Sequence, residues 1–420
     1  MALFASTLFV IAYVLISAEH KLKISKSAIA LLFGGLLWVL IAINDPINMP
    51  AHLNKVGEEI FGIVVFLLSA MALVEILVHY RFFDLIRTWL LAKKLNNTQQ
   101  LWLISSLAFI SSPIIDNLTT SVVFSQLSRL FFKGKNLIVA VSLVVISANA
   151  GGAFSPIGDV TTTMLWLKGK FSSSDVILYG FAPSLTIYLI AAVLITKKIS
   201  KGSEHAPKFE NIKLLFSEKV VIGFTLGSFS LPFIFHSFGL KPYMGLLTGL
   251  GFTWILIDLL KIKLPNHQSH FTASIEHLLQ RVDISSLKFF IGILLAVAAL
   301  DHFGILKSLS DSLFGSNPSL QRYIIGNSVM GLLSAVVDNV PLTAAAMNII
   351  NTSEPSIWVL AAITLGTGGS LLLVGSAAGI IAMGIVKDLN FSNYLKVATL
   401  PATVGYVCGI AVWYLEYLLR

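Results

Sequence analysis

The feature that most restricts the fold of this chain is an interruption inside an apolar segment. Residues 147–166, SANAGGAFSPIGDVTTTMLW, combine glycines and a proline with polar side chains, although the whole segment is long enough to cross a lipid bilayer. An unbroken helix cannot accommodate them. Backbone groups released from helical hydrogen bonds are tolerated at membrane depth only beside protein or a water-filled cavity. The stretch therefore predicts a cavity, and its acidic, oxygen-rich side chains predict a cation site.

Composition places the rest of the chain in the same class. Of 420 residues, 56% are hydrophobic and only 12% are charged, which is typical of a polytopic membrane protein rather than a soluble enzyme. The basic residues lie in short loops between apolar runs, as membrane topology requires, so we expect the lipid bilayer and not nucleic acid as a partner. The single cysteine, Cys408, excludes a disulfide framework. We expect no cofactor.

Ten apolar runs are each long enough to form a membrane span. They are residues 1–18, 28–44, 59–79, 137–167, 176–196, 220–237, 242–260, 289–303, 357–386 and 394–417. The first is interpreted as a membrane helix and not as a signal peptide, because no basic segment precedes it. Two further segments, 101–132 and 320–350, are interrupted at SSPIIDNLTT and SAVVDNVPLT. We interpret each of these as a re-entrant helical hairpin, which enters and leaves on one side of the membrane.

The distribution of Lys and Arg supports the hairpin interpretation. With two hairpins, the loops that share one side hold 22 of the 29 basic residues. These loops are 19–27, 80–100, 128–136, 197–219, 261–288 and 387–396. The positive-inside rule then predicts that they are cytoplasmic and that both termini face outward. The expected location is a bacterial inner membrane.

An internal repeat divides the chain into halves. Asp116 and Asn117 match Asp338 and Asn339, and the glycine pattern around the first break recurs after position 366. The repeats are residues 1–196 and 220–420, joined by a cytoplasmic linker at 197–219. Each half contains an odd number of crossings, so the second is inverted relative to the first. The predicted fold is an all-α polytopic membrane protein with two inverted repeats, each of five transmembrane helices plus one re-entrant hairpin, and with discontinuous helices at the midplane. Secondary transporters have this architecture.

Acidic residues inside the membrane are functional candidates because burying them is costly. Asp116 and Asp338 lie at the hairpin breaks, and Asp159 lies in the broken span, where its counterpart in the second half is Ser376. The alternative is that the two hairpin aspartates only cap the following helix. Both roles are compatible, because a break also exposes carbonyl oxygens that favour a cation. The polar neighbours that we include are Thr119, Asn149, Ser155, Thr161, Thr162, Ser334, Thr343, Thr367 and Ser370.

No Lys or Arg is predicted among these carboxylates. Carboxylates without a basic partner suit Na⁺, Li⁺ or H⁺. Because burial disfavours a charged carboxylate, a proton and a sodium ion can compete for it, which is sufficient for an exchanger. Glu75 and His79 share a helix face, and Asp301 lies at the matching place in the second half. These three are candidates for a proton relay or pH sensing; the alternative for the histidine is an interfacial residue without such a role.

Four motifs carry a resemblance to a known family. ANAGGAFSPIGDVTTTMLW, PIIDNLTTSVVF, SAVVDNVPLTAAAM and GTGGSLLLVGSAAG closely resemble NhaD-type sodium/proton antiporters, in the wider ion transporter superfamily that includes arsenite and citrate carriers. The resemblance covers nearly the whole chain and implies Na⁺(Li⁺)/H⁺ antiport. A homodimer is expected by analogy alone. The residues that the resemblance marks are Asp116, Asn117, Asn149, Asp159, Thr161, Thr162, Ser334, Asp338, Asn339, Thr367 and Ser370.

Two other functions compete with the antiporter. A sodium-coupled carboxylate symporter of the same superfamily is expected to have uncharged hairpin tips, unlike the acidic tips here. An intramembrane aspartyl protease needs two membrane aspartates, but Pro156-Ile157-Gly158-Asp159 is not the Gly-x-Gly-Asp motif of such proteases. The preferred hypothesis is therefore exchange by competition of H⁺ and Na⁺ for the aspartates, with alternating access.

Overall fold

The chain is all-helical in the computed structural model, which describes residues 1–17, 19–93, 95–200, 214–263, 280, 282–315 and 318–420 and contains no β-strand among them. The first-half helices are α1 (Ala2–Ser17), α2 (Glu19–Leu22), α3 (Lys26–Asn44), α4 (Met49–His79), α5 (Phe82–Ala92), α6 (Asn97–Ile115), α7 (Asn117–Phe131), α8 (Gly134–Ala153), α9 (Val160–Leu167) and α10 (Ser173–Thr196). The second-half helices are α11 (Phe216–Ser228), α12 (Leu231–Ser237), α13 (Pro242–Lys263), α15 (Ile284–His302), α16 (Ile305–Leu313), α17 (Leu320–Leu333), α18 (Asn339–Ile349), α19 (Pro355–Gly368), η2 (Leu373–Gly375), α20 (Ala377–Ile385), α21 (Phe391–Tyr394), η3 (Leu395–Thr399) and α22 (Leu400–Leu419). Most of the predicted linker lies outside the described residues.

The prediction of a polytopic membrane protein is confirmed. Among the described residues, eight helices are long and apolar enough to cross a membrane, and two shorter apolar helices, Ala2–Ile16 and Pro355–Gly368, accompany them. Several boundaries differ from the predicted spans, and two of these differences have a clear cause. Helix α4 begins at Met49 and not at position 59, because its first turns are helical but polar and hydropathy cannot detect them. The predicted span 220–237 is divided into α11 and α12 where Pro232 opens the second helix.

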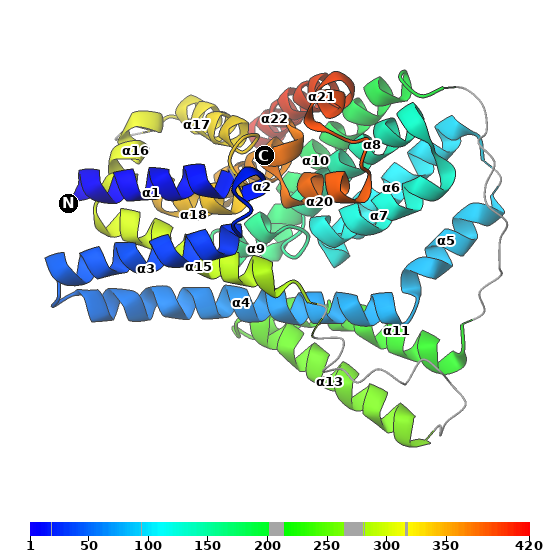
Figure 1. Cartoon of the computed structure of the whole chain (residues 1–420), viewed down its shortest axis with the longest axis horizontal. Coiled ribbons are helices and arrows are strands. Elements are labelled where there is room, and N and C mark those ends of the chain that lie inside the picture. Colours follow the sequence, from blue (N-terminus) through cyan, green and yellow to red (C-terminus); the bar gives the residue numbers. More distant parts are fainter. Residues whose placement is uncertain (18, 94, 201–213, 264–279, 281, 316–317) are drawn as a thin grey trace.

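One group of helices runs lengthwise through the molecule. Figure 1 shows α1, α3, α4 and α15 side by side, with the N-terminus at the end away from α5. Helices α3 and α15 approach so closely that a Cβ on Gly292 would overlap the backbone of Ala30, so glycine is required there. Polar groups tie the same pair together: Trp38 Nε1 donates to the carbonyl of Leu295 at 3.0 Å.

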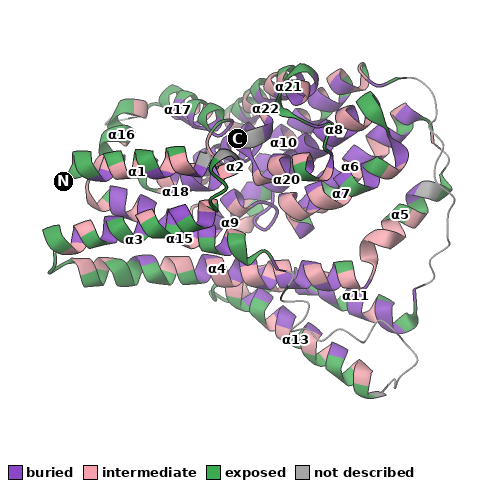
Figure 2. Ribbon diagram, viewed as in Figure 1, coloured by how far each residue is buried: buried purple, intermediate pink, exposed green. Residues whose placement is uncertain are grey.

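A second group surrounds α8, one of the most enclosed helices in the described part of the chain. Every residue from 139 to 153 is buried, and a helix that is apolar all round belongs in such a core. Its neighbours are α6, α7, α10, α19 and α20. Figure 2 shows buried residues concentrated in this group, whereas α1, α3 and α13 carry exposed residues along their length.

Two close helix crossings hold this second group in register. A Cβ on Gly151 in α8 would overlap the carbonyl oxygen of Phe109 in α6. A Cβ on Gly368 in α19 would likewise overlap the carbonyl oxygen of Gly331 in α17. Both glycines therefore permit backbone-to-backbone contact, and the two crossings bring the interrupted segments 147–166 and 366–376 into the core.

Candidate functional site

Two helix breaks face each other in the core. Helix α8 ends at Ala153 and α9 begins at Val160, while α19 ends at Gly368 and α20 begins at Ala377. Each break folds back tightly on itself: a Cβ on Gly369 would lie 2.7 Å from the carbonyl oxygen of Gly375. The side chains of Asp159 and Ser376 cap the helices that follow, by accepting from the backbone N–H of Thr161 at 3.3 Å and of Gly379 at 3.2 Å.

A buried polar cluster, made of Asn117, Asn149, Ser370 and Ser376, connects the two breaks. Asn117 Nδ2 donates to Asn149 Oδ1 at 3.0 Å. Asn149 Nδ2 donates to Ser370 Oγ at 2.8 Å and to Ser376 Oγ at 3.0 Å. Since Asn149 is completely buried, a fully satisfied network of this kind fixes one arrangement of the two halves. These predicted site residues are therefore brought together.

Asp116 lies at the junction of α6 and α7. Its φ is +68°, a left-handed conformation that non-glycine residues seldom adopt and that concentrates at functional sites. One carboxylate oxygen accepts from the backbone N–H of Thr119 and the other from the Thr119 hydroxyl, both at 2.8 Å. Next to it, the N–H of Asn117 donates to the carbonyl of Gly158 at 2.9 Å. Asp116 is thus a helix cap that also contacts the first break through its neighbour.

Asp159 has the least satisfied carboxylate of the site. Its residue is 2% exposed, and its Oδ2 has no hydrogen-bond partner in the described part of the chain. The same is true of the buried Thr161 Oγ1. Both oxygens face α19 at Gly366, where a Cβ would lie 3.0 Å from Asp159 Oδ2 and 3.5 Å from Thr161 Oγ1. Buried polar atoms without partners are costly and mark places where an ion or water binds.

Asp338 has a basic neighbour, so our prediction of carboxylates without Lys or Arg is wrong here. Lys26 Nζ lies 3.8 Å from Asp338 Oδ2. The side chain of Asp338 also caps α18 by accepting from the N–H of Val340 at 3.3 Å, and its own N–H donates to the hydroxyl of Tyr13 at 3.0 Å. The sequence placed Lys26 in a cytoplasmic loop, but it opens α3 beside the α18 terminus, and its long flexible side chain spans the gap.

A small cavity joins two of the three aspartates. It has a volume of about 30 Å³ and is lined by Asp159, Asp338, Lys26, Asn117 and Asn339, among others. A cavity of this size holds about one or two water-sized particles. Asp159 and Asp338, predicted from opposite halves of the sequence, therefore line one small cavity.

Most of the predicted hydroxyl residues bind backbone carbonyls. Ser155 Oγ donates to Pro113 at 2.7 Å and Ser334 Oγ donates to Leu365 at 2.8 Å. Thr162 donates to Ala153 at 3.5 Å, and Thr343 and Thr367 each donate to a carbonyl four residues earlier in their own helices. These side chains hold the shape of the breaks, and their part in ion binding stays a prediction.

Of the three candidates for proton relay, Glu75 and His79 lie one turn apart on α4, and Asp301 lies on another helix, α15. Glu75 lines a cavity of about 720 Å³ between α4, α5 and α7, which Thr119 also lines. Thr119 also donates two hydrogen bonds to the Asp116 carboxylate, so that carboxylate lies close to the cavity. His79 packs edge-on against Tyr80, with 5.2 Å between ring centroids. Asp301 is exposed near the end of α15 and lines none of the cavities described here.

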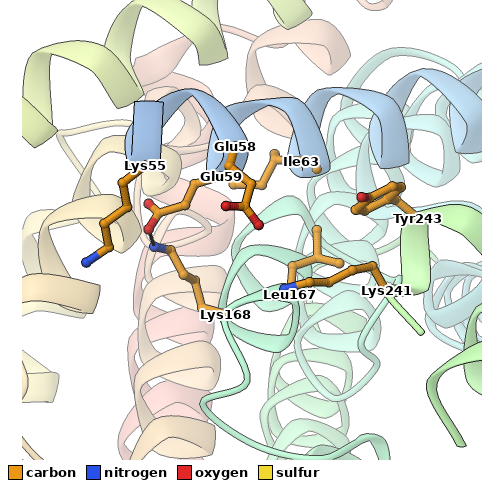
Figure 3. A pocket seen from close by; sticks show the side chains of 9 residues that line it. Lys55, Glu58, Glu59, Ile63, Leu167, Lys168, Lys241 and Tyr243 are labelled. Atoms are coloured by element: carbon orange, nitrogen blue, oxygen red, sulfur yellow. Dashed lines mark ion pairs between the residues drawn. The ribbon is translucent and has the colours of Figure 1, made fainter. Parts of the chain in front are cut away.

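A second polar cavity lies at the other end of α9. It measures about 240 Å³, and Figure 3 shows Lys168, which follows α9, reaching toward Glu59 on α4 to form an ion pair. Glu58, Lys55 and Lys241 surround the pair. Because α9 begins at the Asp159 cap and ends before Lys168, this ion pair anchors to α4 the same short helix that carries Asp159.

Sequence reasoning missed Lys26, Tyr13 and Phe289. Lys26 and Phe289 line the small cavity, and Tyr13 binds the backbone of Asp338. None of them belongs to a motif, and Lys26 differs from other loop lysines only in its position in space. No signal in a single sequence distinguishes them.

Comparison with known proteins matches the chain to one transporter family and to several antiporters. The sequence model of the citrate transporter family, CitMHS, matches residues 11–366. Sodium/proton antiporter 2 of Arabidopsis thaliana is 36% identical over 418 residues, which cover 97% of each chain. Sodium/proton antiporter 1 of the same plant is 37% identical over 97% of this chain and 71% of its own length. The Na(+)/H(+) antiporter NhaD of Alkalimonas amylolytica is 32% identical over 96% of this chain and 88% of its own.

Proposed function

Because this chain belongs to the citrate transporter (CitMHS) family, in the group of the NhaD-type sodium/proton antiporters, we propose that it exchanges Na⁺ for H⁺ across a membrane. It is a transporter and not an enzyme. Transport of Li⁺, assembly as a homodimer and location in a bacterial inner membrane stay predictions from the resemblance.

One observation carries the proposal for the site: Asp159 Oδ2 and Thr161 Oγ1 are buried together, and neither has a hydrogen-bond partner in the described part of the chain. Hard cations such as Na⁺ bind carboxylate and hydroxyl oxygens. A cation between these two oxygens satisfies both and neutralises the carboxylate. The neighbouring cavity of about 30 Å³, shared with Asp338, supports a pathway for one small ion at a time.

Competition supplies the coupling between the two ions. A buried carboxylate is more stable when neutral, and either a bound proton or a bound Na⁺ makes it neutral. A proton and a Na⁺ ion cannot occupy the same pair of oxygens at once, so binding of one ion releases the other. In this proposal Asp159 and Asp338 exchange the ions directly. Asp116 organises the break next to them, and the inward flow of H⁺ drives Na⁺ out.

The architecture proposed for alternating access is the pair of inverted repeats. Two hydrogen bonds at matching places support it: Ser112 donates to Ala148 at 2.6 Å, and Ser334 donates to Leu365 at 2.8 Å. In this proposal α6 with α7 and α17 with α18 are the re-entrant hairpins, and both termini face outward. Such repeats in secondary transporters place the ion site between them, where rocking of one part exposes it to either side.

The cavity of about 720 Å³ supports access from the cytoplasmic side of this topology. The acidic residues Glu75 and Asp84 line it, and so does Thr119, which donates two hydrogen bonds to Asp116. Three arginines line it as well, Arg81, Arg87 and Arg129. In this proposal ions from the aqueous phase enter the cavity, whose lining carries both acidic and basic side chains.

The experiment that tests the function uses the full chain in proteoliposomes with a preformed pH gradient. We expect addition of Na⁺ to dissipate the gradient, and addition of Li⁺ to do the same. Asp159→Asn and Asp338→Asn should abolish the response, whereas the matched control Asp388→Asn, an exposed carboxylate after α20, should not. If Na⁺ acts only when a dicarboxylate is also present, a sodium-coupled symporter replaces the antiporter.

A further inference from the structure

The basic residue at Asp338 is held there by several contacts. Lys26 is the first residue of α3, and its backbone N–H donates to Glu19 Oε1 at 2.9 Å. Its ammonium lies 3.8 Å from Asp338 Oδ2 and 4.7 Å from the centre of the Phe289 ring. The Lys26 and Asp338 side chains are 24% and 18% exposed. A pair this enclosed is only partly screened by solvent.

The two aspartates that border the small cavity therefore differ in charge balance. Asp338 has a resident cation, the ammonium of Lys26, while Asp159 Oδ2 has no partner among the described residues. Asp159, Asp338 and Lys26 all line the same cavity of about 30 Å³. A Na⁺ ion binds poorly at Asp338 while the ammonium stays beside it, because two cations a few ångströms apart in a poorly solvated space repel strongly.

We propose that the ammonium of Lys26 is a tethered cation that occupies Asp338 in the Na⁺-free protein, and that Na⁺ must displace it in order to bind the Asp338 carboxylate. Lys26 then sets the Na⁺ affinity of the carrier as a built-in competitor. This inference rests on the proposed sodium/proton exchange. It assigns to a residue outside every motif a direct effect on Na⁺ affinity.

Lysine has the properties that such a competitor needs. Its charge is a compact point on a flexible four-carbon stem, so it can leave the carboxylate without a change of backbone. In its paired position the ammonium also lies over the face of Phe289, and this cation–π contact does not depend on the carboxylate. Tyr13 and the α18 cap hold the Asp338 backbone in place meanwhile, so displacement of the ammonium leaves the carboxylate where the ion can reach it.

The test measures Na⁺ affinity with two readouts on the purified full-length protein at alkaline pH. The first is the Na⁺ concentration that produces half of the ligand-induced rise in melting temperature. The second is the Na⁺ concentration for half-maximal dissipation of the pH gradient. For Lys26→Met we expect both concentrations to fall by about tenfold, because close charge pairs in poorly solvated sites couple by that much or more. Lys26→Arg retains the charge and should keep both values within about twofold of the parent.

A matched control and a second neutral variant complete the design. Lys288→Met removes an exposed lysine that directly precedes Phe289, and it should leave both concentrations unchanged. Lys26→Gln also removes the charge and should lower both Na⁺ concentrations by about tenfold. It serves as the test variant if Lys26→Met does not fold.

Three results overturn the inference. Neutral variants with parental Na⁺ concentrations show that Lys26 does not compete, and neutral variants with raised concentrations show that Lys26 helps to build the site. A fall in Lys26→Arg as large as that in Lys26→Met shows that shape and not charge is responsible. In each case the parent still exchanges Na⁺ for H⁺, so the proposed function stands; a parent without any Na⁺ response overturns both proposals together.

Discussion

Gly366 is the position where a single methyl group tests the ion site most directly. In the predicted repeat, Gly366 corresponds to Asn149, whose side chain fills its surroundings by binding two serines. Gly366 has no side chain, and the space opposite it is bordered by Asp159 Oδ2 and Thr161 Oγ1. Gly366→Ala puts a methyl group against these two buried oxygens, for which the described residues offer no hydrogen-bond partner.

The magnitude follows from the geometry. The new Cβ would lie 3.0 Å from Asp159 Oδ2, against 3.4 Å for ordinary contact, so the carboxylate has to retreat by about 0.4 Å. Its other oxygen is held by the N–H of Thr161, so the retreat weakens that bond or strains the backbone. Overpacking of this kind costs about 1–3 kcal/mol. Loss of one contact to a charged ligand costs about 1.5–3 kcal/mol, which corresponds to a rise of roughly 10- to 100-fold in the Na⁺ concentration for half-maximal transport.

The assay is Na⁺-driven dissipation of a pH gradient in proteoliposomes over a range of Na⁺ concentrations, with the melting temperature in detergent as the measure of folding. Gly251→Ala is the matched control, because it lies within α13 and its Cβ would meet nothing within 4 Å. It should leave transport unchanged and stabilise the helix by up to about 1 kcal/mol. A folded Gly366→Ala protein with parental Na⁺ dependence would refute the reasoning and exclude the Asp159–Thr161 oxygens as the ion site.

Three further variants have expected outcomes. Gly368→Ala forces a Cβ into the Gly331 carbonyl oxygen, so it should lower the free energy of unfolding by about 3 kcal/mol or more, seen as a lower melting temperature. Asn149→Ala removes three buried hydrogen bonds, and we expect a loss of about 3 kcal/mol together with loss of Na⁺-driven transport; normal transport would contradict the role of the polar cluster. Glu59→Gln breaks a partly exposed ion pair with Lys168 and should cost less than about 1 kcal/mol, a difference that high salt should remove from the melting temperatures.

Much of the architecture was readable from the sequence, because in a bilayer each helix must satisfy its own backbone. Apolar length therefore predicted ten spans, and each overlaps an apolar helix in the structure. Helix breakers among polar residues marked the interrupted segments for the same reason. Asp116, Asp159 and Asp338 stood out because an acid in an apolar run is rare. Asp116 and Asp338 cap helices as the capping alternative predicted, and Asp159 caps α9, which was not predicted.

Tertiary structure alone decided which of these groups share a cavity and which of them lack a partner. Local pattern assigned Lys26 to a loop, yet the packing of α3 against α15 carries it to Asp338 from more than 300 residues away. Helix packing likewise brings Asn149 into hydrogen-bond contact with Ser370 and Ser376 of the other half. The distance between two residues that are far apart in the sequence depends on how their helices cross. Close contacts at glycines determine these crossings, and such contacts exist only in the packed structure. The sequence determined the spans, the breaks and the acids, and the packing determined the charge balance at each acid.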